Sequence, residues 1–377
     1  MKIAQVCRAL PRKAGTERFI LETTREISRR GIETRIYTTA VNNELYADVS
    51  KFVRIHKSAI TAIPLFHLYS ELTISKRLIG LASSWADTII LHHGTAVAGG
   101  AFRKYRIPCI PFFHIDKYDT SLYNALHWIT PAYTYPLKVL ESNSIRSIPL
   151  AFANSRSLGN RVSQCTNAEN VVTIPLGVDI DRFYPTWADD QFILMVGRYH
   201  PANNFELGIA AASKTRYRVI VAGIHEPRFE WYFRQLQRLV NESSELRNRV
   251  DFLSPNDNDL IDLIQNCSIF LSPRKYDYLG LAALEAMACG KPVIAYKTDD
   301  ETEGCEGIAE CGDSAQNWEQ AVTTLARDRD LRSTIGAKSR AFVERAHTWR
   351  NTVDVMLDSI NEFADGPSWI DNRLRTF

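Results

Sequence analysis

Residues 272–295, with the sequence SPRKYDYLGLAALEAMACGKPVIA, constrain the fold more than any other part of the chain. They combine the end of an apolar strand, an acidic loop, a glycine turn, a helix of small residues and a second apolar strand. In an α/β protein this order places a helix N-terminus at the carboxyl edge of a parallel sheet, where anionic ligands bind. Asp277 before the turn and Glu285 in the helix add two carboxylates. The segment therefore predicts a site for a phosphorylated sugar.

The alternative is a structural role for the same segment. Leu281, Leu284, Met287 and Ala288 have the helical spacing of a core-facing stripe, which any α/β protein would need. In that interpretation Glu285 is a solvated helix residue.

Length and composition favour a two-domain globular protein. A chain of 377 residues is long enough for two cores, and 45% apolar and 23% charged residues are ordinary values. A net charge of +2 gives no strong field for nucleic acid. The seven cysteines are odd in number and contain no Cys-x-x-Cys pair, which argues against a disulfide framework or a zinc site and favours the cytoplasm.

Membrane-related signals are weak. No apolar run approaches the ~20 residues that span a bilayer, and the N-terminal MKIAQVCRALP predicts a strand rather than a secretory signal. Arg25, Arg29, Arg30 and Arg35 gather near the predicted first helix, where a solvated face and an anion- or lipid-binding face are both open interpretations. Peripheral contact with the inner face of the membrane stays open on this basis.

Strands alternate with helices along the chain, which predicts parallel sheets covered by helices on both faces. In the first half we expect strands at 3–7, 34–38, 88–91, 109–113, 150–154 and 171–174, a helix at 17–30 capped by Gly31, and helical pieces over 118–149. A new unit begins after Pro175–Asp179. There we expect strands at 192–196, 217–222, 250–253 and 268–271, and helices at 204–212, 230–241, 259–266, 318–327 and 330–346.

The first strand of the second half ends in Gly197-Arg198, followed by HPANN and a helix. A glycine at a strand end allows a ligand to approach the backbone, and a guanidinium beside it can bind phosphate oxygens in a bidentate manner. The alternative is an exposed arginine with a surface partner. The position of this pair, one strand after the domain junction, favours an anion site.

Taken together, these segments resemble family 4 retaining glycosyltransferases of the GT-B fold. The resemblance is carried by RALPRKAGTERF, IPLGVDIDRFYP, VGRYHPANNFELGIAAA, residues 272–295 and the closing HTWRNTVDVMLDSINEF, and it extends over essentially the whole chain. It implies two doubly wound Rossmann-like domains facing across a cleft. These are an acceptor-side domain at 1–177, a nucleotide-sugar-binding domain at 178–350, and a tail at 351–377 that crosses back to the first domain.

The resemblance assigns donor-binding roles within residues 272–295. Glu285 would bind the ribose hydroxyls and Asp277 would lie near the donor sugar. Backbone N–H groups around Leu279, Gly280 and Leu281 would receive the sugar or diphosphate. Gly197 and Arg198 would bind the diphosphate, and the base would bind near Leu253, Ser254 and Pro255.

Two positions depart from the family pattern. Asp277 stands where the family usually has a glutamate, which is one methylene longer. Asn203 stands where a lysine usually joins Arg198 in neutralising the diphosphate, and Arg274 or Lys275 are the nearest replacement cations in sequence. A missing cation would be consistent with slow turnover, and Asn203→Lys would then raise the rate.

In the first domain the resemblance points to Gly15 and His114. Gly15, in the loop after the first strand, would allow the donor to approach, and His114, at a strand end, matches a histidine that faces the donor sugar. The catalytic set implied is His114, Asp277 and Arg198. For His92 and His93, at the end of another strand, acceptor-side and structural roles are equally open.

We therefore expect a hexosyltransferase that uses a nucleotide-sugar donor, retains anomeric configuration and needs no metal or cofactor, because cations and helix N–H groups neutralise the leaving group. Its acceptor would be a glycan, a lipid-linked molecule or a small molecule, in glycan, glycolipid or polysaccharide synthesis. A catalytically weakened binding or scaffold subunit and a nucleotide-sugar epimerase are the alternatives. The sequence does not specify the base, the sugar, the acceptor or the oligomeric state.

Overall fold

The computed structural model describes residues 1–11, 15–42, 54–57, 67–92, 105, 107–114, 135, 139, 143, 150–166, 170–274, 279–296, 305 and 307–365. The polypeptide forms two compact units. Unit 1 consists of residues 1–175 together with the C-terminal residues from Trp349, and unit 2 consists of Leu176–Thr348. The last described helix, α13 (Trp349–Asp365), therefore belongs to the N-terminal unit.

The sheet of unit 1 is parallel and has seven strands in the order β5-β3-β1-β6-β7-β8-β9. Its strands are β1 (Lys2–Val6), β3 (Glu33–Thr38), β5 (Arg54–Lys57), β6 (Thr88–His92), β7 (Cys109–Phe113), β8 (Ala151–Ala153) and β9 (Val171–Thr173). Strands β6 and β7 are buried at every residue, as expected for a sheet covered on both faces. A separate pair joins β2 (Ala9–Leu10) to β4 (Ala40–Val41).

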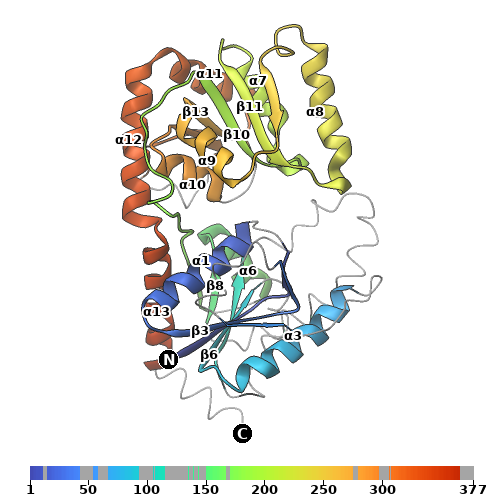
Figure 1. The fold of residues 1–377 in the computed structure, drawn as a ribbon, viewed down its shortest axis with the longest axis vertical. Helices are drawn as coiled ribbons and strands as arrows, with labels where there is room; N and C mark the ends of the chain where they lie inside the picture. Colours follow the sequence, from blue (N-terminus) through green and yellow to red (C-terminus); the bar gives the residue numbers. More distant parts are fainter. Residues whose placement is uncertain are drawn as a thin grey trace. The chain divides into compact units, whose positions relative to one another are not determined.

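Helices cover both faces of this sheet (Figure 1). The amphipathic helix α1 (Gly15–Arg29) contributes Ile20 and Leu21 to one core cluster, and α3 (His67–Ser83) contributes Ile74, Leu78 and Ile79 to another. The other helices within the described residues of the unit are α6 (Arg156–Thr166) and α13, which packs on α1. Gly31 follows α1 with φ +74°, the left-handed conformation of a helix C-terminal glycine, which confirms the predicted cap.

The sheet of unit 2 is also parallel, with the order β12-β11-β10-β13-β14-β15. The strands are β10 (Phe192–Arg198), β11 (Arg218–Ile224), β12 (Val250–Leu253), β13 (Ile269–Ser272), β14 (Val293–Tyr296) and β15 (Ile308–Cys311). Strand β10 lies between β11 and β13, two strands that come from different parts of the chain. Such a change of strand order is where ligands bind in open α/β sheets.

One set of helices shares a core with this sheet: α7 (Phe205–Ala212), α8 (Glu230–Glu242) and α11 (Ala315–Arg327), with the fully buried Trp318 among their side chains. The helix α10 (Leu281–Ala288) packs against α9 (Asp257–Asn266) and α12 (Arg329–Ala346). The short 3-10 helices η4 (Pro201–Asn203) and η5 (Pro227–Phe229) follow β10 and β11. Both units are thus doubly wound, as expected.

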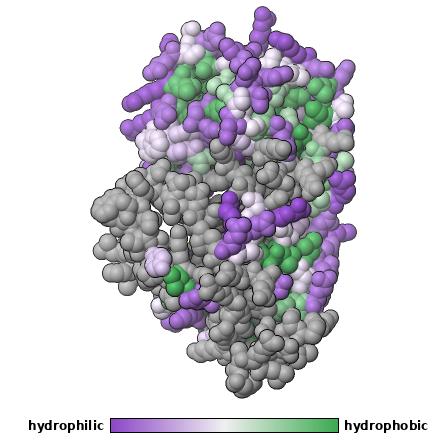
Figure 2. All heavy atoms as spheres, turned by 180° about the vertical axis from the view of Figure 1, so that it is seen from behind, coloured by the Kyte–Doolittle hydropathy of each residue, from purple (hydrophilic) through white to green (hydrophobic). Residues whose placement is uncertain are grey.

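The predicted strands and helices in the described parts of the chain are present, with ends that differ by at most three residues. The sequence analysis missed β2, β4, β5, α3 and β15, which are short or have weak periodicity. Apart from Tyr135, Val139 and Asn143, the helical pieces expected over 118–149 lie outside the described residues. Figure 2 shows hydrophilic side chains spread over the visible part of unit 2, with smaller apolar patches among them. Within the described segments, no helix is long and apolar enough to cross a bilayer.

Candidate functional site

The carboxyl ends of β10 and β11 are held together by two glycines. Gly197 and Gly223 are paired in the sheet register. A Cβ added to Gly223 would lie only 2.2 Å from the carbonyl oxygen of Gly197, and one added to Gly197 would lie 2.9 Å from Nδ2 of Asn203. Packing within the protein therefore requires glycine at position 223, where the clash would be with backbone, and leaves little room for a larger residue at position 197.

Arg198, the last residue of β10, has a side chain that is 57% exposed. Its Nη1 donates to Oε1 of Glu226 at 2.8 Å. Asn203 does not extend toward solvent as a lysine would, because its Nδ2 donates to the main-chain carbonyl of Arg198 at 2.6 Å. The residue that departs from the family pattern thus fixes the backbone that carries the arginine.

The pKa of His200 depends on the charged groups around the end of β10. Its Nδ1 accepts a hydrogen bond from the N–H of Ala202 at 3.0 Å, which requires an unprotonated nitrogen there. Burial lowers the pKa of His200, and the positive charges of Arg198, Arg228 and Arg274 lower it further, while Glu226 opposes them. Three arginines from three different segments therefore create a positive field beside β10.

The N-terminus of α10 lies beside one of these arginines. Gly280 precedes the helix with φ +82°, a conformation that strongly favours glycine, and no side chain caps the first turn. A Cβ added to Gly280 would lie 3.0 Å from Nη1 of Arg274, so that guanidinium lies against the helix entrance. Helix N–H groups and a guanidinium together suit an anion.

The other predicted residues of this segment occupy different environments. Leu279 is buried and Leu281 is the first residue of α10, while Glu285, in the middle of α10, is only 2% exposed. The interpretation of Glu285 as a solvated residue is therefore wrong. Asp277 and Lys275 lie outside the described residues. Lys291, after α10, is buried, and its Nζ donates to the carbonyl of Ala188 at 2.7 Å.

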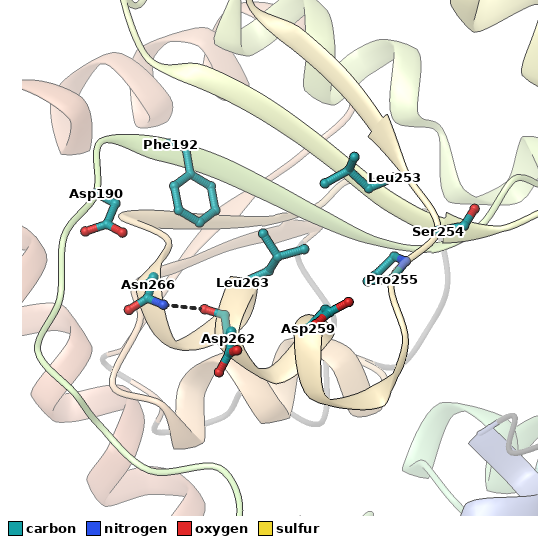
Figure 3. A pocket seen from close by; sticks show the side chains of 9 residues that line it. All are labelled: Asp190, Phe192, Leu253, Ser254, Pro255, Asp259, Asp262, Leu263 and Asn266. Carbon is teal, nitrogen blue, oxygen red and sulfur yellow. Dashed lines mark hydrogen bonds between the residues drawn. The ribbon is translucent and has the colours of Figure 1, made fainter.

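A pocket of about 420 Å³ lies along α9, and the three residues predicted for base binding line it. Leu253 and Leu263 project toward each other across it, with Phe192 farther along and Pro255 at the other end (Figure 3). The hydroxyl of Ser254 donates to the carbonyl of Gly223 at 2.9 Å. The other lining residues carry carboxylate or amide side chains: Asp190, Asp259, Asp262 and Asn266. An apolar wall with acidic groups suits a neutral ring better than a phosphate.

The candidate residues of unit 1 lie at the carboxyl end of its sheet. Gly15 is exposed at the first residue of α1. His114 directly follows β7 and is buried, and its Nε2 forms a 2.8 Å hydrogen bond with Nδ1 of His92, the last residue of β6. His92 is completely buried, so its role is structural, and it does not lie at an exposed acceptor site. His93 lies outside the described residues.

No group of three or more histidine, cysteine or carboxylate side chains in the described part of the chain is arranged to hold a metal ion. The structure describes the side chains of six cysteines, and all six are free. Burial raises the pKa of Cys7 and of Cys267 to about 12, so neither thiol is reactive at neutral pH.

Sequence reasoning missed Glu226 and Arg228 as members of this site. Both follow β11, and only the pairing of β11 with β10 brings them to Arg198. The position of Glu226 after a Gly-containing strand end is the single signal that the sequence offered.

Family models match both halves of the chain. The model described as Glycosyltransferase Family 4 matches residues 14–182, and the model described as Glycosyl transferases group 1 matches residues 179–342. Together they cover most of the chain, which belongs to glycosyltransferase family 4. It is accordingly a glycosyltransferase of a family of retaining enzymes that use nucleotide-sugar donors.

Relatives and solved structures agree with this assignment. The D-inositol 3-phosphate glycosyltransferase of Mycolicibacterium smegmatis is 23% identical over 378 residues, which cover 92% of this chain and 85% of the relative. Sucrose-phosphate synthase from Thermosynechococcus elongatus has the same fold, with a TM-score of 0.79 at 18% identity, over 97% of this chain and all of that one. HepE from Anabaena, in complex with UDP-glucose, gives a TM-score of 0.76 at 18% identity, over 96% and 100%. The fold is therefore GT-B.

Proposed function

We propose that unit 2 binds the donor at the carboxyl end of β10 and at the N-terminus of α10. Arg198 and Arg274 bind the diphosphate together with the N–H groups of Leu281 and its neighbours, and Glu285 binds the ribose hydroxyls. Leu253, Ser254 and Pro255 border the base. As the bond to the anomeric carbon breaks, negative charge grows on the leaving diphosphate, and preorganised cations stabilise that charge.

The placement of Arg274 carries this proposal. Its guanidinium lies against Gly280 and contributes to the positive field at His200, which Arg198 also creates. A second cation therefore lies at the entrance of α10, although position 203 holds an asparagine. With two guanidinium groups and a helix N-terminus, the site needs no metal ion for charge neutralisation.

The remaining roles rest on the family resemblance. We propose that His114 and Gly15 act on the sugar of the donor, that Asp277 positions that sugar, and that unit 1 binds the acceptor. The acceptor is a glycan, a lipid-linked molecule or a small molecule. The protein works in the cytoplasm, with peripheral contact to the inner face of the membrane when the acceptor is lipid-linked.

UDP is the first probe to use, because the HepE structures contain UDP or UDP-glucose. Isothermal titration calorimetry should show binding of UDP to the wild-type protein and a loss of about tenfold or more in Arg274→Ala and Arg198→Ala. Arg238→Ala, which changes an exposed arginine on α8, is the matched control and should bind like the wild type. GDP and ADP, titrated in parallel, report the base preference.

The alternatives give different results. A binding or scaffold subunit would bind the nucleotide without transferring sugar to any acceptor in a mass-spectrometric screen. An epimerase would convert the donor sugar in the absence of an acceptor. Absence of binding to all three nucleoside diphosphates would overturn the proposed site.

A further inference from the structure

His200 lies two residues beyond Arg198, between the end of β10 and the short helix η4. Its Nδ1 accepts a hydrogen bond from the N–H of Ala202 at 3.0 Å, so the ring is the N-cap of η4. A ring nitrogen that accepts a hydrogen bond carries no proton. The proton of the neutral ring is therefore on Nε2, and His200 is an Nε2–H tautomer.

The surroundings of His200 keep its ring neutral at neutral pH. Burial is the main cause of its lowered pKa, and the charges of Arg198, Arg228 and Arg274 lower this pKa further. The carboxylate of Glu226 opposes them in part. A second proton would have to enter at Nδ1, where it would break the hydrogen bond that caps η4. His200 is therefore a hydrogen-bond donor that carries no charge.

The N–H group at Nε2 is open to a ligand. Nε2 lies on the opposite edge of the ring from the nitrogen that caps η4. It has no hydrogen-bond partner among the described residues, and it is not enclosed by protein as the unpaired Nε2 of His56 is. His200 is half-buried and follows the strand end at which the exposed side chain of Arg198 lies. A ligand that reaches Arg198 therefore meets this N–H group as well.

Phe229 holds the plane of the His200 ring. The two rings meet edge-on, with centroids 4.1 Å apart and 66° between their planes. The guanidinium carbon of Arg228 in turn lies 5.5 Å from the centroid of Phe229. The cap on one edge and the aromatic contact fix Nε2 before any ligand binds. A donor that is fixed in advance stabilises negative charge without a cost of reorganisation.

We infer that Nε2 of His200 donates a hydrogen bond to the diphosphate of the nucleotide-sugar donor, beside the guanidinium groups of Arg198 and Arg274. The inference rests on the proposed function, because that function places the diphosphate at this strand end. His200 then adds a neutral donor to the leaving group in a chain that has an asparagine at position 203.

A purely structural role is the alternative, since a side chain that caps η4 needs no ligand. Two substitutions separate the cap from the donor, because each keeps one edge of the ring. His200→Asn places Oδ1 near the position of Nδ1 and keeps the cap, but it has no atom at the position of Nε2. His200→Gln places its NH₂ group near the position of Nε2 and keeps the donor, but it loses the cap.

Calorimetry with UDP and thermal unfolding of the full-length variants distinguish the two roles. We expect His200→Asn to lose about tenfold or more in affinity for UDP at an unchanged melting temperature, as for a lost hydrogen bond to a charged group. His200→Gln should keep the affinity within about threefold, while its melting temperature falls by about 2–4 °C through loss of the cap. Wild-type affinity in His200→Asn, or an equal loss in both variants, would overturn the inference.

The tautomer can be measured without a ligand. In protein labelled with ¹⁵N-histidine, long-range ¹H–¹⁵N correlation should show a protonated Nε2 and an unprotonated Nδ1 for His200, whose signals are those missing from His200→Asn. An Nδ1–H tautomer would overturn the inference.

Failure of the proposed function gives a different result. If the wild-type protein does not bind UDP, GDP or ADP, or if Arg198→Ala and Arg274→Ala bind UDP as tightly as the wild type, the proposed diphosphate site is wrong. If these two variants lose affinity and His200→Asn does not, only the role of His200 is wrong.

Discussion

The side-chain amide of Asn203 donates a 2.6 Å hydrogen bond to the main-chain carbonyl of Arg198. The family pattern places a lysine at position 203, and a lysine directed at a phosphate could not make this contact. Asn203 thus supplies no positive charge and instead holds the backbone of Arg198 in place. This arrangement is consistent with a second positive charge supplied from elsewhere, and Arg274 is in place at Gly280.

We predict that Asn203→Lys changes kcat less than about threefold in the wild-type background, because Arg274 already provides the second charge. In the Arg274→Ala background, the same substitution should recover a large part of a rate loss of about 10²-fold, the cost typical of removing a preorganised donor. Steady-state kinetics of the single and double variants test this coupling. A large rate increase from Asn203→Lys alone would instead support the sequence-based hypothesis that the missing lysine limits turnover.

The ion pair between Arg198 and Glu226 should weaken diphosphate binding. The guanidinium must share its donors or leave Glu226 when a diphosphate arrives. We expect Glu226→Gln to raise the affinity for UDP by about two- to fivefold, the range of an exposed ion pair, and the gain to shrink in high salt. Calorimetry at two salt concentrations measures it. Lower affinity in Glu226→Gln would mean that the carboxylate itself contributes to binding.

The contact between Gly223 and Gly197 predicts a loss of stability. In Gly223→Ala the new methyl group would meet the carbonyl of Gly197 at 2.2 Å, and backbone atoms cannot turn away as a side chain could. We expect the free energy of unfolding to fall by about 2–3 kcal/mol, as in overpacked sites. Gly312→Ala is the matched control, because nothing lies within 4 Å of its added Cβ. Equal melting temperatures for the two variants would contradict the close approach.

His347 should make stability depend on pH near neutrality. Burial lowers the pKa of this histidine, and its hydrogen bond to the carbonyl of Leu176, at 3.0 Å, opposes the shift only in part. The unfolded chain therefore takes up a proton near pH 6.5, before the folded one does. The contribution of His347 is complete above that pH and is lost as the pH falls toward the lower folded value.

Urea unfolding at pH 8 and pH 6 should show a smaller decrease in His347→Gln than in the wild type, by at most about 1.4 kcal/mol per pH unit. Burial also lowers the pKa values of His56 and His200, so the variant should keep part of the pH dependence. An unchanged slope in His347→Gln would show that this ring does not titrate differently in the two states.

The sequence by itself determined the α/β class, most strands and the family. These properties are local: strand periodicity, the glycine caps at Gly31 and Gly280, and contiguous motifs such as residues 272–295. It also determined Glu285 and Arg198 as candidates, since both lie within those motifs.

The tertiary structure decided which groups meet. Parallel strands bring together residues that are distant in sequence, and for this reason Arg198 pairs with Glu226 and Gln5 contacts His92. The sequence analysis left the role of His92 open between acceptor-side and structural interpretations. Only the folded arrangement, in which His92 contacts both Gln5 and His114, could place this histidine in the interior of unit 1.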